Sequence, residues 1–259
     1  MKFAAVIPAR YASTRFPGKP LVKLGGKYII ERVYQQVSNV ISDVCVATDD
    51  KRIQSAVEAF GGRVVMTSPN HQSGTDRICE AIDKLYPENP TAVHCSDDTR
   101  TPDVIINVQG DEPFIQRSQL ETVMRCFDDA DTQIATLGKP FADMEAVKNP
   151  NSPKIIIDNN HYALYFSRSV IPFVRGKEDA DWIKCYPFLK HIGLYAYRTN
   201  VLREITKLPQ SSLELAESLE QLRWLQNGFR IKVGLTDVET IGIDTPDDLK
   251  RAELFLTKI

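Results

Sequence analysis

The sequence predicts an α/β protein whose sheet is mostly parallel and flanked by helices. Through the first half of the chain, short runs of apolar and β-branched residues alternate with segments of helical periodicity. The first of these runs, at residues 3–8, is apolar at every position, which is typical of a strand covered on both faces. Strands spaced by helices form right-handed βαβ units, and such units place helices on both faces of the sheet.

The expected elements can be placed in order along the chain. The first half has strands at residues 3–8, 44–48, 63–67 and 104–108, and helices at residues 29–40, 50–60 and 75–85. The second half is mixed, with strands at residues 154–158, 163–167, 191–197 and 230–235, a long amphipathic helix at 213–226 and a closing helix at 245–256. Residues 87–102 are rich in Pro, Asp, Ser and Thr, so they are expected to form a loop.

Composition limits the classes of function. The chain has 259 residues and a formal net charge of −2, so no strong global field favours nucleic acid or an anionic membrane. The five cysteines include no CxxC pair, which argues against a disulfide framework or a zinc ribbon and fits a reducing cytosol. The N-terminal apolar run is too short for a signal peptide, and no run reaches the roughly 18–20 residues that cross a bilayer. We therefore expect a cytoplasmic protein that binds neither nucleic acid nor membranes.

A basic loop follows the first strand. Residues 9–21 carry Arg10, Arg15 and Lys19, with small residues between them. A loop of this kind can offer backbone N–H groups and fixed cations to a triphosphate, and ligands of open α/β sheets bind beyond the carboxyl ends of the strands. Neither GxxxxGK[ST] nor GxGxxG is present, which removes the P-loop and dinucleotide-binding interpretations. A solvated basic loop is the alternative interpretation.

A second group of polar residues opens the helix expected after the third strand. Ser73, Thr75 and Asp76 are natural residues at a helix N-terminus, so capping explains much of this segment. Helix N-termini also bind anionic or polar groups of ligands. Both interpretations remain open from the residues alone.

Two aspartates are candidates for a metal site. Asp111 stands beside Gly110 just after the fourth strand, and Asp244 precedes the closing helix. Mg²⁺ typically takes one or two carboxylates together with substrate phosphates. A tight turn would also explain Asp111, and an N-cap would explain Asp244. Whether the sheet brings the two side chains together is not readable from the sequence.

The helix expected at residues 213–226 has two different faces. Leu215, Leu219 and Leu222 fall on an apolar face. Other residues share a second face by the i+3 and i+4 rule, namely Glu217, Glu220, Gln221 and Trp224. A solvated charged face is the default interpretation of these residues, although the hydroxyl groups of a sugar need acceptors of this kind.

Motifs along essentially the whole chain resemble one family. These are IPARYASTRFPGKPL at residues 7–21, ATDD at 47–50, HQSGTDR at 71–77, NVQGDEP at 107–113, ALYFSRSVIP at 163–172, HIGLYAYR at 191–198, LEQLRWL at 219–225 and GIDTPDDL at 242–249. In this order they are similar to the motifs of the CMP-Kdo synthetases, the 3-deoxy-manno-octulosonate cytidylyltransferases. Related cytidylyltransferases share the first loop but not all of the later segments.

The resemblance implies a fold and a set of site residues. The fold would be a Rossmann-like nucleotidyltransferase fold with a smaller mixed α+β lobe for substrate binding and dimerisation. It would form a single domain over residues 1–259, with a nucleotide-binding part at about 1–130, a sugar-binding and dimerisation part at about 131–240, and a closing helix at 245–257. The implied catalytic residues are Arg10, Lys19, Asp111 and Asp244; the implied nucleotide-binding residues are Arg10, Ser13, Lys19, Ser73, Thr75, Arg77 and Gln109; and the implied sugar-binding residues are Arg168, His191, Tyr195, Glu220 and Gln221.

The resemblance also implies a reaction and its cofactor. The substrates would be CTP and the acidic sugar Kdo. The products would be diphosphate and CMP-Kdo, and the CMP-Kdo would be used in lipopolysaccharide biosynthesis. Asp111 and Asp244 would hold Mg²⁺, with two ions during turnover, and the protein would be a homodimer. The same chemistry on the 8-amino analogue of Kdo is the alternative. The segment at residues 88–101 is longer than the connection usual in the family, and its role is not readable from the sequence.

Overall fold

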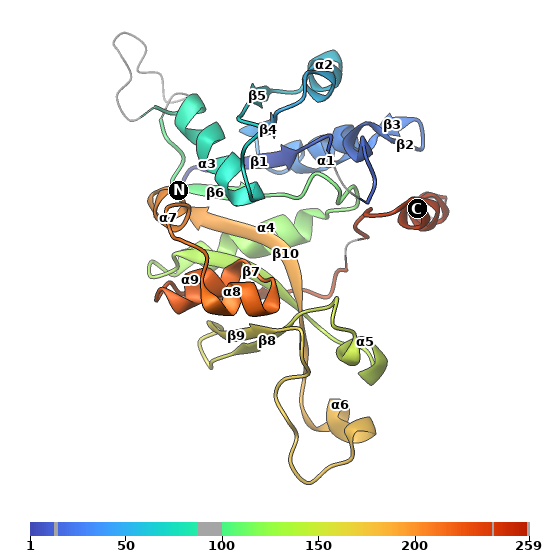
Figure 1. The fold of residues 1–259 in the computed structure, drawn as a ribbon, viewed down its shortest axis with the longest axis vertical. Helices are drawn as coiled ribbons and strands as arrows, with labels where there is room; N and C mark the ends of the chain where they lie inside the picture. The colour runs from blue at the N-terminus through green and yellow to red at the C-terminus, as the bar shows by residue number, and fades with distance from the viewer. Residues whose placement is uncertain (13–14, 88–99, 240, 258–259) are drawn as a thin grey trace. The chain divides into compact units, whose positions relative to one another are not determined.

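The chain folds into two compact units. The computed structural model describes residues 1–12, 15–87, 100–239 and 241–257 (Figure 1). The first unit comprises residues 1–120, 198–206 and 240–259, and the second comprises residues 121–197 and 207–239. Residues 198–206, which lie within the range expected for the sugar-binding part, thus belong to the first unit. The organisation as one domain with two parts stays a prediction.

The first unit is built on four parallel strands. They are β1 (Phe3–Ala9), β4 (Val44–Thr48), β5 (Val64–Met66) and β6 (Val104–Asn107), in the spatial order β6-β1-β4-β5. Val6 on the central strand faces Cys45 of β4 and Asn107 of β6 in register. Every residue of β4 and of β6 is buried, as expected for strands covered on both faces.

Helices flank this sheet and the loops that connect its strands. They are α1 (Ile29–Ser38), α2 (Lys51–Ala59), α3 (Gly74–Leu85), α7 (Thr199–Ile205), α10 (Pro246–Leu256) and the short η1 (Lys19–Leu21), and a small hairpin of β2 (Lys23–Leu24) and β3 (Lys27–Tyr28) precedes α1. The apolar residues of α1 recur with helical spacing, and Ile29, Ile30, Val33 and Val37 are buried. A capping box of Thr245 and Asp248 and a proline in the first turn start α10 at Pro246.

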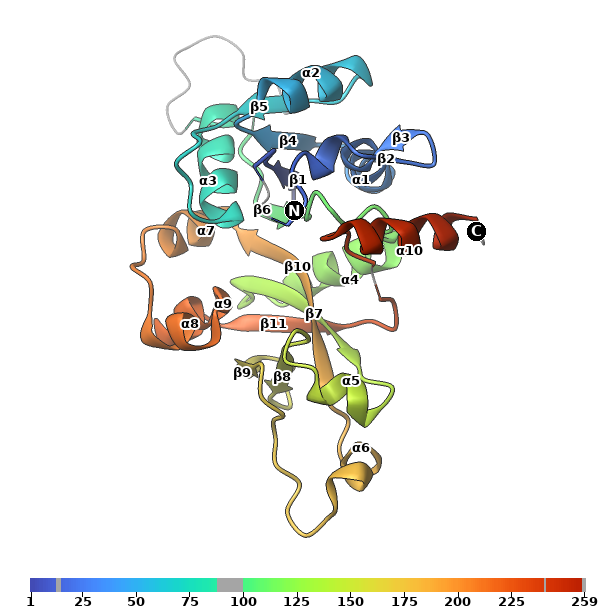
Figure 2. The ribbon, with the colours of Figure 1, turned by 45° about the vertical axis from the view of Figure 1, so that its right-hand side comes forward.

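The second unit holds a mixed sheet. Its strands are β7 (Ile134–Pro140), β8 (Lys154–Ile157), β9 (Ala163–Ser167), β10 (Leu189–Arg198) and β11 (Ile231–Leu235). β7 pairs parallel with β11 and antiparallel with β10, as the neighbouring arrows of Figure 2 show. β8 pairs antiparallel with β10 and with β9.

The remaining elements flank or extend this sheet. They are α4 (Arg117–Arg125), η3 (Cys126–Asp128), α5 (Met144–Lys148), η4 (Asp179–Asp181), α6 (Trp182–Cys185), α8 (Ser212–Glu217) and α9 (Gln221–Gln226). The largest side chains that are almost wholly buried in this unit include Trp224, Tyr197, Phe127 and Phe166. No helix among the described residues is long and apolar enough to cross a membrane.

The prediction of one long helix at residues 213–226 is wrong. The segment forms two short helices, α8 and α9, because Ser218 adopts a left-handed conformation with φ 49°. The guanidinium of Arg168 donates to the carbonyls of Glu217 and Ser218, at 2.7 and 3.3 Å, and so takes acceptors that a continuous helix would use. The single apolar face is lost as well, since Leu215 is 62% exposed while Leu222 is buried.

The other expected elements are present, with ends that differ by a few residues at most. The strand β7 and the helices α4 to α7 were not expected from the sequence. The loop expected at residues 87–102, including the long segment at 88–101, lies for the most part outside the described residues.

Candidate active site

The loop after β1 turns sharply before η1. Gly18 has φ 72°, and a Cβ at this position would meet the ring of Tyr11 at 3.0 Å, so only glycine fits without strain. The Gly18 N–H donates to the Tyr11 carbonyl at 2.9 Å, and Pro20 occupies the first turn of η1. The turn carries Lys19 inward, where only 9% of the residue remains exposed.

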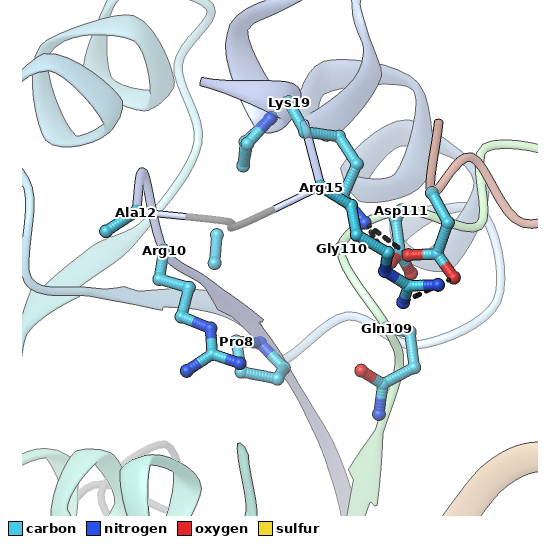
Figure 3. Close-up of a pocket in the computed structure, with 11 residues that line it drawn as sticks. Pro8, Arg10, Ala12, Arg15, Lys19, Gln109, Gly110 and Asp111 are labelled. Carbon is cyan, nitrogen blue, oxygen red and sulfur yellow. Dashed lines mark hydrogen bonds and ion pairs between the residues drawn. The ribbon is translucent and has the colours of Figure 1, made fainter. Parts of the chain in front are cut away.

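Lys19 contacts two aspartates that are far apart in the sequence. Its Nζ lies 2.5 Å from Asp111 Oδ2 and 3.0 Å from Asp244 Oδ1 (Figure 3). The Ile243 N–H donates to the Asp111 carbonyl at 3.0 Å, so the segment before α10 is held against the loop after β6. The structure therefore brings Asp111 and Asp244 together through a shared lysine.

The neighbours of Asp111 and Asp244 complete this arrangement. A Cβ at Gly110 would lie 2.9 Å from the Pro8 carbonyl oxygen, so the loop after β6 can approach β1 this closely only with glycine. The guanidinium of Arg15 lies 3.0 Å from Asp244 Oδ2, although its side chain is 65% exposed.

The charge on Lys19 is stabilised by its partners. Burial on its own lowers the pKa of Lys19, but the charge of Asp111 and the hydrogen bonds to Asp111 and Asp244 outweigh this effect and raise the pKa. Lys19 is therefore an ammonium ion at neutral pH and offsets the repulsion between the two carboxylates.

The two carboxylates fit a magnesium site that a substrate completes. Their oxygens are the ligands that Mg²⁺ prefers, and Mg²⁺ usually takes one or two carboxylates with phosphates and water. In the part of the chain that the structure describes, no group of three or more His, Cys, Asp or Glu side chains could hold a metal. A divalent ion at Asp111 and Asp244 would thus need further ligands from a bound triphosphate or from water.

The cluster lines a polar cavity of about 330 Å³. Its walls are Pro8, Ala9, Arg10, Ala12, Arg15, Lys19, Pro20, Gln109, Gly110, Asp111 and Asp244. The labelled residues of Figure 3 come from the end of β1, the loop after it, the start of η1 and the loop after β6. A second cavity of about 120 Å³ is lined by Pro8, Ala9, Arg10, His71, Ser73, Gly74, Arg77 and Gln109. Because the two cavities share Arg10 and Gln109, they can accommodate the two ends of one elongated ligand.

The residues expected around the nucleotide have different surroundings. Ser73 caps α3 through the Asp76 N–H, as the capping interpretation predicts, and it also lines the small cavity. Gln109 lines both cavities, whereas Thr75 is buried and lines neither. Ser13 lies outside the described residues.

Arg77 is held rigidly in the wall of the small cavity. Its guanidinium donates to Thr67 Oγ1 at 2.6 Å and to Asp49 Oδ2 at 2.9 Å, and the residue is only 4% exposed. A buried guanidinium that is paired on two sides loses little side-chain entropy when it meets a ligand.

His71 lines the small cavity, a role that was not predicted from the sequence. Its Nε2 is bonded to Glu80, which also accepts from the Ser68 N–H at 2.8 Å, and these contacts hold the ring against the small cavity. Burial would raise the pKa of Glu80, but hydrogen bonds from Lys84, Ser68 and His71 lower it to about 2. The signal was present, because His71 opens the HQSGTDR motif.

In the second unit, Arg168 is held between the end of β9 and the turn after α8. Its backbone N–H donates to Glu217 Oε2 at 2.9 Å, and Glu217 Oε1 accepts from Ser167 Oγ at 2.6 Å. The buried Lys154 donates to the Arg168 carbonyl at 2.5 Å. Glu217 and Lys154 thus fix the backbone of Arg168, and neither role was predicted.

His191 and Tyr195 lie together on β10. Their rings are 5.3 Å apart, and Thr136 Oγ1 lies 3.2 Å from His191 Nε2. Burial lowers the pKa of His191 to about 4 and raises the pKa of Tyr195 well above its ordinary value. Both side chains are therefore neutral at neutral pH and can serve a polar ligand through hydrogen bonds.

Glu220 and Gln221 lie at the start of α9. Glu220 is the residue before the helix, and Gln221 is its first residue and is buried. Among the described residues, no partner accepts a hydrogen bond from the buried Gln221 Nε2. Trp224, expected on the same face, instead packs edge-on against Tyr195 at 5.2 Å and is buried in the core.

Comparison with known proteins decides the family. The model of a family described as "Cytidylyltransferase" matches residues 4–233. The chain belongs to the cytidylyltransferase family. It is 62% identical to 3-deoxy-manno-octulosonate cytidylyltransferase of Phocaeicola vulgatus over 99% of this chain and 98% of the relative, and 61% identical to the protein of that name from Bacteroides thetaiotaomicron over the same shares. An 8-amino-3,8-dideoxy-manno-octulosonate cytidylyltransferase of a Shewanella strain is 43% identical over 98% of both chains.

A solved structure supports the same placement within the cytidylyltransferases. CMP:2-keto-3-deoxy-manno-octonic acid synthetase, solved with CTP bound, superposes with a TM-score of 0.88 at 38% identity and covers 100% of this chain and 99% of its own. The expected α/β nucleotidyltransferase fold and the resemblance to the 3-deoxy-manno-octulosonate cytidylyltransferases are both confirmed.

Proposed function

We propose that this cytidylyltransferase transfers CMP from CTP to 3-deoxy-D-manno-octulosonate (Kdo) and releases diphosphate. The observation that carries the proposal is the cluster of Lys19, Asp111 and Asp244 in a cavity that also presents Arg10 and Arg15. Cations for a triphosphate and carboxylates for a divalent ion are the two things that nucleotidyl transfer requires. The high identity to relatives named for this reaction supports the choice of sugar.

The reaction is an in-line substitution at phosphorus. The anomeric hydroxyl oxygen of the sugar forms a bond to the α-phosphorus of CTP, the bond from that phosphorus to the bridging oxygen breaks, and diphosphate leaves with the electron pair. The proton of the hydroxyl passes to solvent. Most of the acceleration comes from positioning and from charge stabilisation.

The residues of the large cavity would hold the triphosphate. Arg10, Arg15 and Lys19 bind phosphate oxygens and stabilise the charge that develops on the departing diphosphate. Mg²⁺ held by Asp111 and Asp244, with two ions during turnover, would neutralise phosphate charge and lower the pKa of the attacking hydroxyl.

The nucleoside end would occupy the small cavity. Ser73, Arg77 and Gln109 line it, and the rigid Arg77 is suited to orient a polar group of the nucleotide. Thr75, which is buried and lines neither cavity, and Ser13, outside the described residues, remain part of this proposal on the strength of the motif alone.

The acidic sugar would be bound by residues of the second unit. Arg168 carries the charge that a carboxylate needs, while His191, Tyr195, Glu220 and Gln221 offer hydrogen bonds to hydroxyl groups. We further propose that the enzyme acts in the cytoplasm as a homodimer and supplies CMP-Kdo to lipopolysaccharide biosynthesis.

Diphosphate release tests the proposal directly. Purified protein with Mg²⁺ is supplied with CTP and Kdo, with ATP, UTP and GTP as control nucleotides and with EDTA as control for the metal. We expect release that needs both CTP and Kdo and stops with EDTA. Diphosphate release with the 8-amino sugar alone would support the same mechanism with a different sugar substrate. The absence of diphosphate release with every acidic sugar would refute the activity.

A further inference from the structure

The ammonium group of Lys19 lies where a divalent cation would have to bind. It contacts Oδ2 of Asp111 and Oδ1 of Asp244, and Arg15 contacts the second oxygen of Asp244. Three of the four carboxylate oxygens are thus bonded to cationic side chains. The Lys19 side chain is more buried than either aspartate, at 11% exposure against 27% and 45%.

A metal ion and the ammonium group compete for the same oxygens. An ion that bonds to both carboxylates replaces Lys19 on at least one of them, and two positive groups side by side repel each other strongly in a partly buried site. Lys19 has a flexible stem of four methylene groups, so its charge can move away from the aspartates while its backbone in η1 stays in place.

A triphosphate provides the alternative partner for the displaced charge. Lys19 lines the same cavity as Arg10 and Arg15, within reach of the phosphates of a bound nucleotide. We propose that Lys19 is an exchangeable counter-ion that keeps divalent metal away from Asp111 and Asp244 until a nucleoside triphosphate draws it to the phosphates. The inference rests on the proposed nucleotide and metal sites.

The exchange makes metal and nucleotide binding cooperative. Without nucleotide, metal binding has to break the contact of Lys19 with at least one of the two aspartates and leaves its charge without an equivalent partner. With nucleotide, the same ammonium group moves to the phosphates and the carboxylates become available. By linkage, the metal strengthens nucleotide binding by the same factor. Arg15 contributes less, because its exposed guanidinium is screened by solvent.

Metal binding to the nucleotide-free protein tests this proposal. Mn²⁺ serves as the probe, and electron paramagnetic resonance measures the free ion in titrations of the folded enzyme. We expect Lys19→Met to bind Mn²⁺ at least about tenfold more tightly than the unaltered protein, because the variant lacks the positive charge that occupies the two carboxylates. Lys23→Met, which removes an exposed lysine nearby, should leave Mn²⁺ binding unchanged.

Further variants make the result specific to this site. Lys19→Arg keeps the charge and should bind Mn²⁺ weakly, whereas Lys19→Gln removes the charge with a polar side chain and should bind as tightly as Lys19→Met. If Lys19→Met is poorly folded, Lys19→Gln supplies the neutral variant. The added affinity should disappear in Lys19→Met combined with Asp111→Asn.

The contradicting results are equally distinct. Mn²⁺ affinity that is the same in the unaltered protein and in both neutral variants would overturn the counter-ion role, as would tight binding that survives Asp111→Asn. Because these titrations contain neither nucleotide nor sugar, such results leave the proposed function standing. Failure to release diphosphate from CTP and Kdo would instead refute the function and leave the binding difference intact.

Discussion

Burial and charged partners shift the pKa values of single residues of this enzyme in opposite directions. Lys19 is largely buried yet stays charged, because Asp111 and Asp244 outweigh the cost of removing its ammonium group from water. His191 is half-buried between the rings of Phe166 and Tyr195, and no carboxylate among the described residues offsets the loss of solvent, which lowers its pKa to about 4. The first residue can therefore bind anions, whereas the second offers neutral hydrogen bonds.

The lowered pKa of His191 predicts a loss of stability in mild acid. The unfolded histidine takes up a proton near pH 6.5, whereas the folded one does so only near pH 4. Since the unfolded state binds the proton first, stability falls as the pH drops from 6.5 to 4 and the loss is complete below 4. Between pH 7 and 5 this costs up to roughly 2 kcal/mol of unfolding free energy.

Urea denaturation at pH 7 and pH 5 measures this loss. His191→Gln should reduce the difference between the two values, and His161→Asn, at an exposed position with φ 62° that asparagine tolerates, should not. The pKa of Glu80, lowered to about 2, affects stability only as the pH falls from its unfolded value toward 2, which lies below this window. An unchanged pH difference in His191→Gln would contradict the assignment.

At the scale of elements, a single glutamate joins the strand and helices of the candidate sugar site. Glu217 ends α8 and accepts hydrogen bonds from Ser167 Oγ and the Arg168 N–H at the end of β9. The Glu217 carbonyl accepts a hydrogen bond from the Arg168 guanidinium. The chain bends after Glu217, and α9 starts at Gln221. Glu217 is thus a positioning residue for Arg168 and Gln221.

We expect Glu217→Gln to weaken sugar binding selectively. The amide oxygen can accept from only one of the two donors, and the charge-assisted hydrogen bonds of the carboxylate become neutral ones or are lost, which costs about 1–3 kcal/mol. The Michaelis constant for Kdo should rise about tenfold while that for CTP stays the same. Glu145→Gln, on the exposed surface of α5, is the matched control. Equal changes for both substrates would point to general unfolding instead of sugar-site positioning.

Elements with a local signal were predictable from the sequence. The buried strands β1, β4 and β6 are predominantly apolar runs, and capping residues such as Ser73 and Thr245 mark the helix starts. The break between α8 and α9 was not predictable, because it depends on Arg168 from a distant strand. Leu215, Leu219 and Leu222 keep the spacing of one helix across Ser218, so their pattern does not reveal that the helix ends there.

The same distinction applies to the site. Arg10, Lys19 and Asp111 were found from loops that follow strands, Asp244 from its place before the closing helix, and all four from motif resemblance. Their distances were not predictable, since they depend on the backbone hydrogen bond from Ile243 to Asp111. The roles of Glu217 and Lys154 were missed because each acts through another residue's backbone.

At the scale of the whole molecule, the candidate nucleotide and sugar residues belong to different compact units. All residues lining the two cavities lie in the first unit, and the candidate sugar residues lie in the second. A net charge of only −2 leaves the binding of acidic substrates to these local groups.

Hydrogen exchange should therefore separate the two ligands. CTP with Mg²⁺ should slow amide exchange at residues 8–20, 71–77 and 109–111, and Kdo alone should slow it at residues 189–195 and 217–222. Mass spectrometry of peptic peptides gives this map, with ATP as the control nucleotide. Protection by CTP that is confined to the second unit would contradict the assignment of the cavities.

Replacement of Asp244 tests the central claim most directly. Asp244→Asn removes a charge from the cluster but keeps the backbone N–H that bonds to Asp248, so the start of α10 is preserved. Asp247→Asn is the matched control, since that side chain is 85% exposed on the first turn of the same helix. We predict that Asp244→Asn, folded as the unaltered protein is, lowers the turnover number for diphosphate release roughly a hundredfold or more, while Asp247→Asn leaves it unchanged. Near-normal turnover in a folded Asp244→Asn protein would show that cytidylyl transfer does not depend on this cluster.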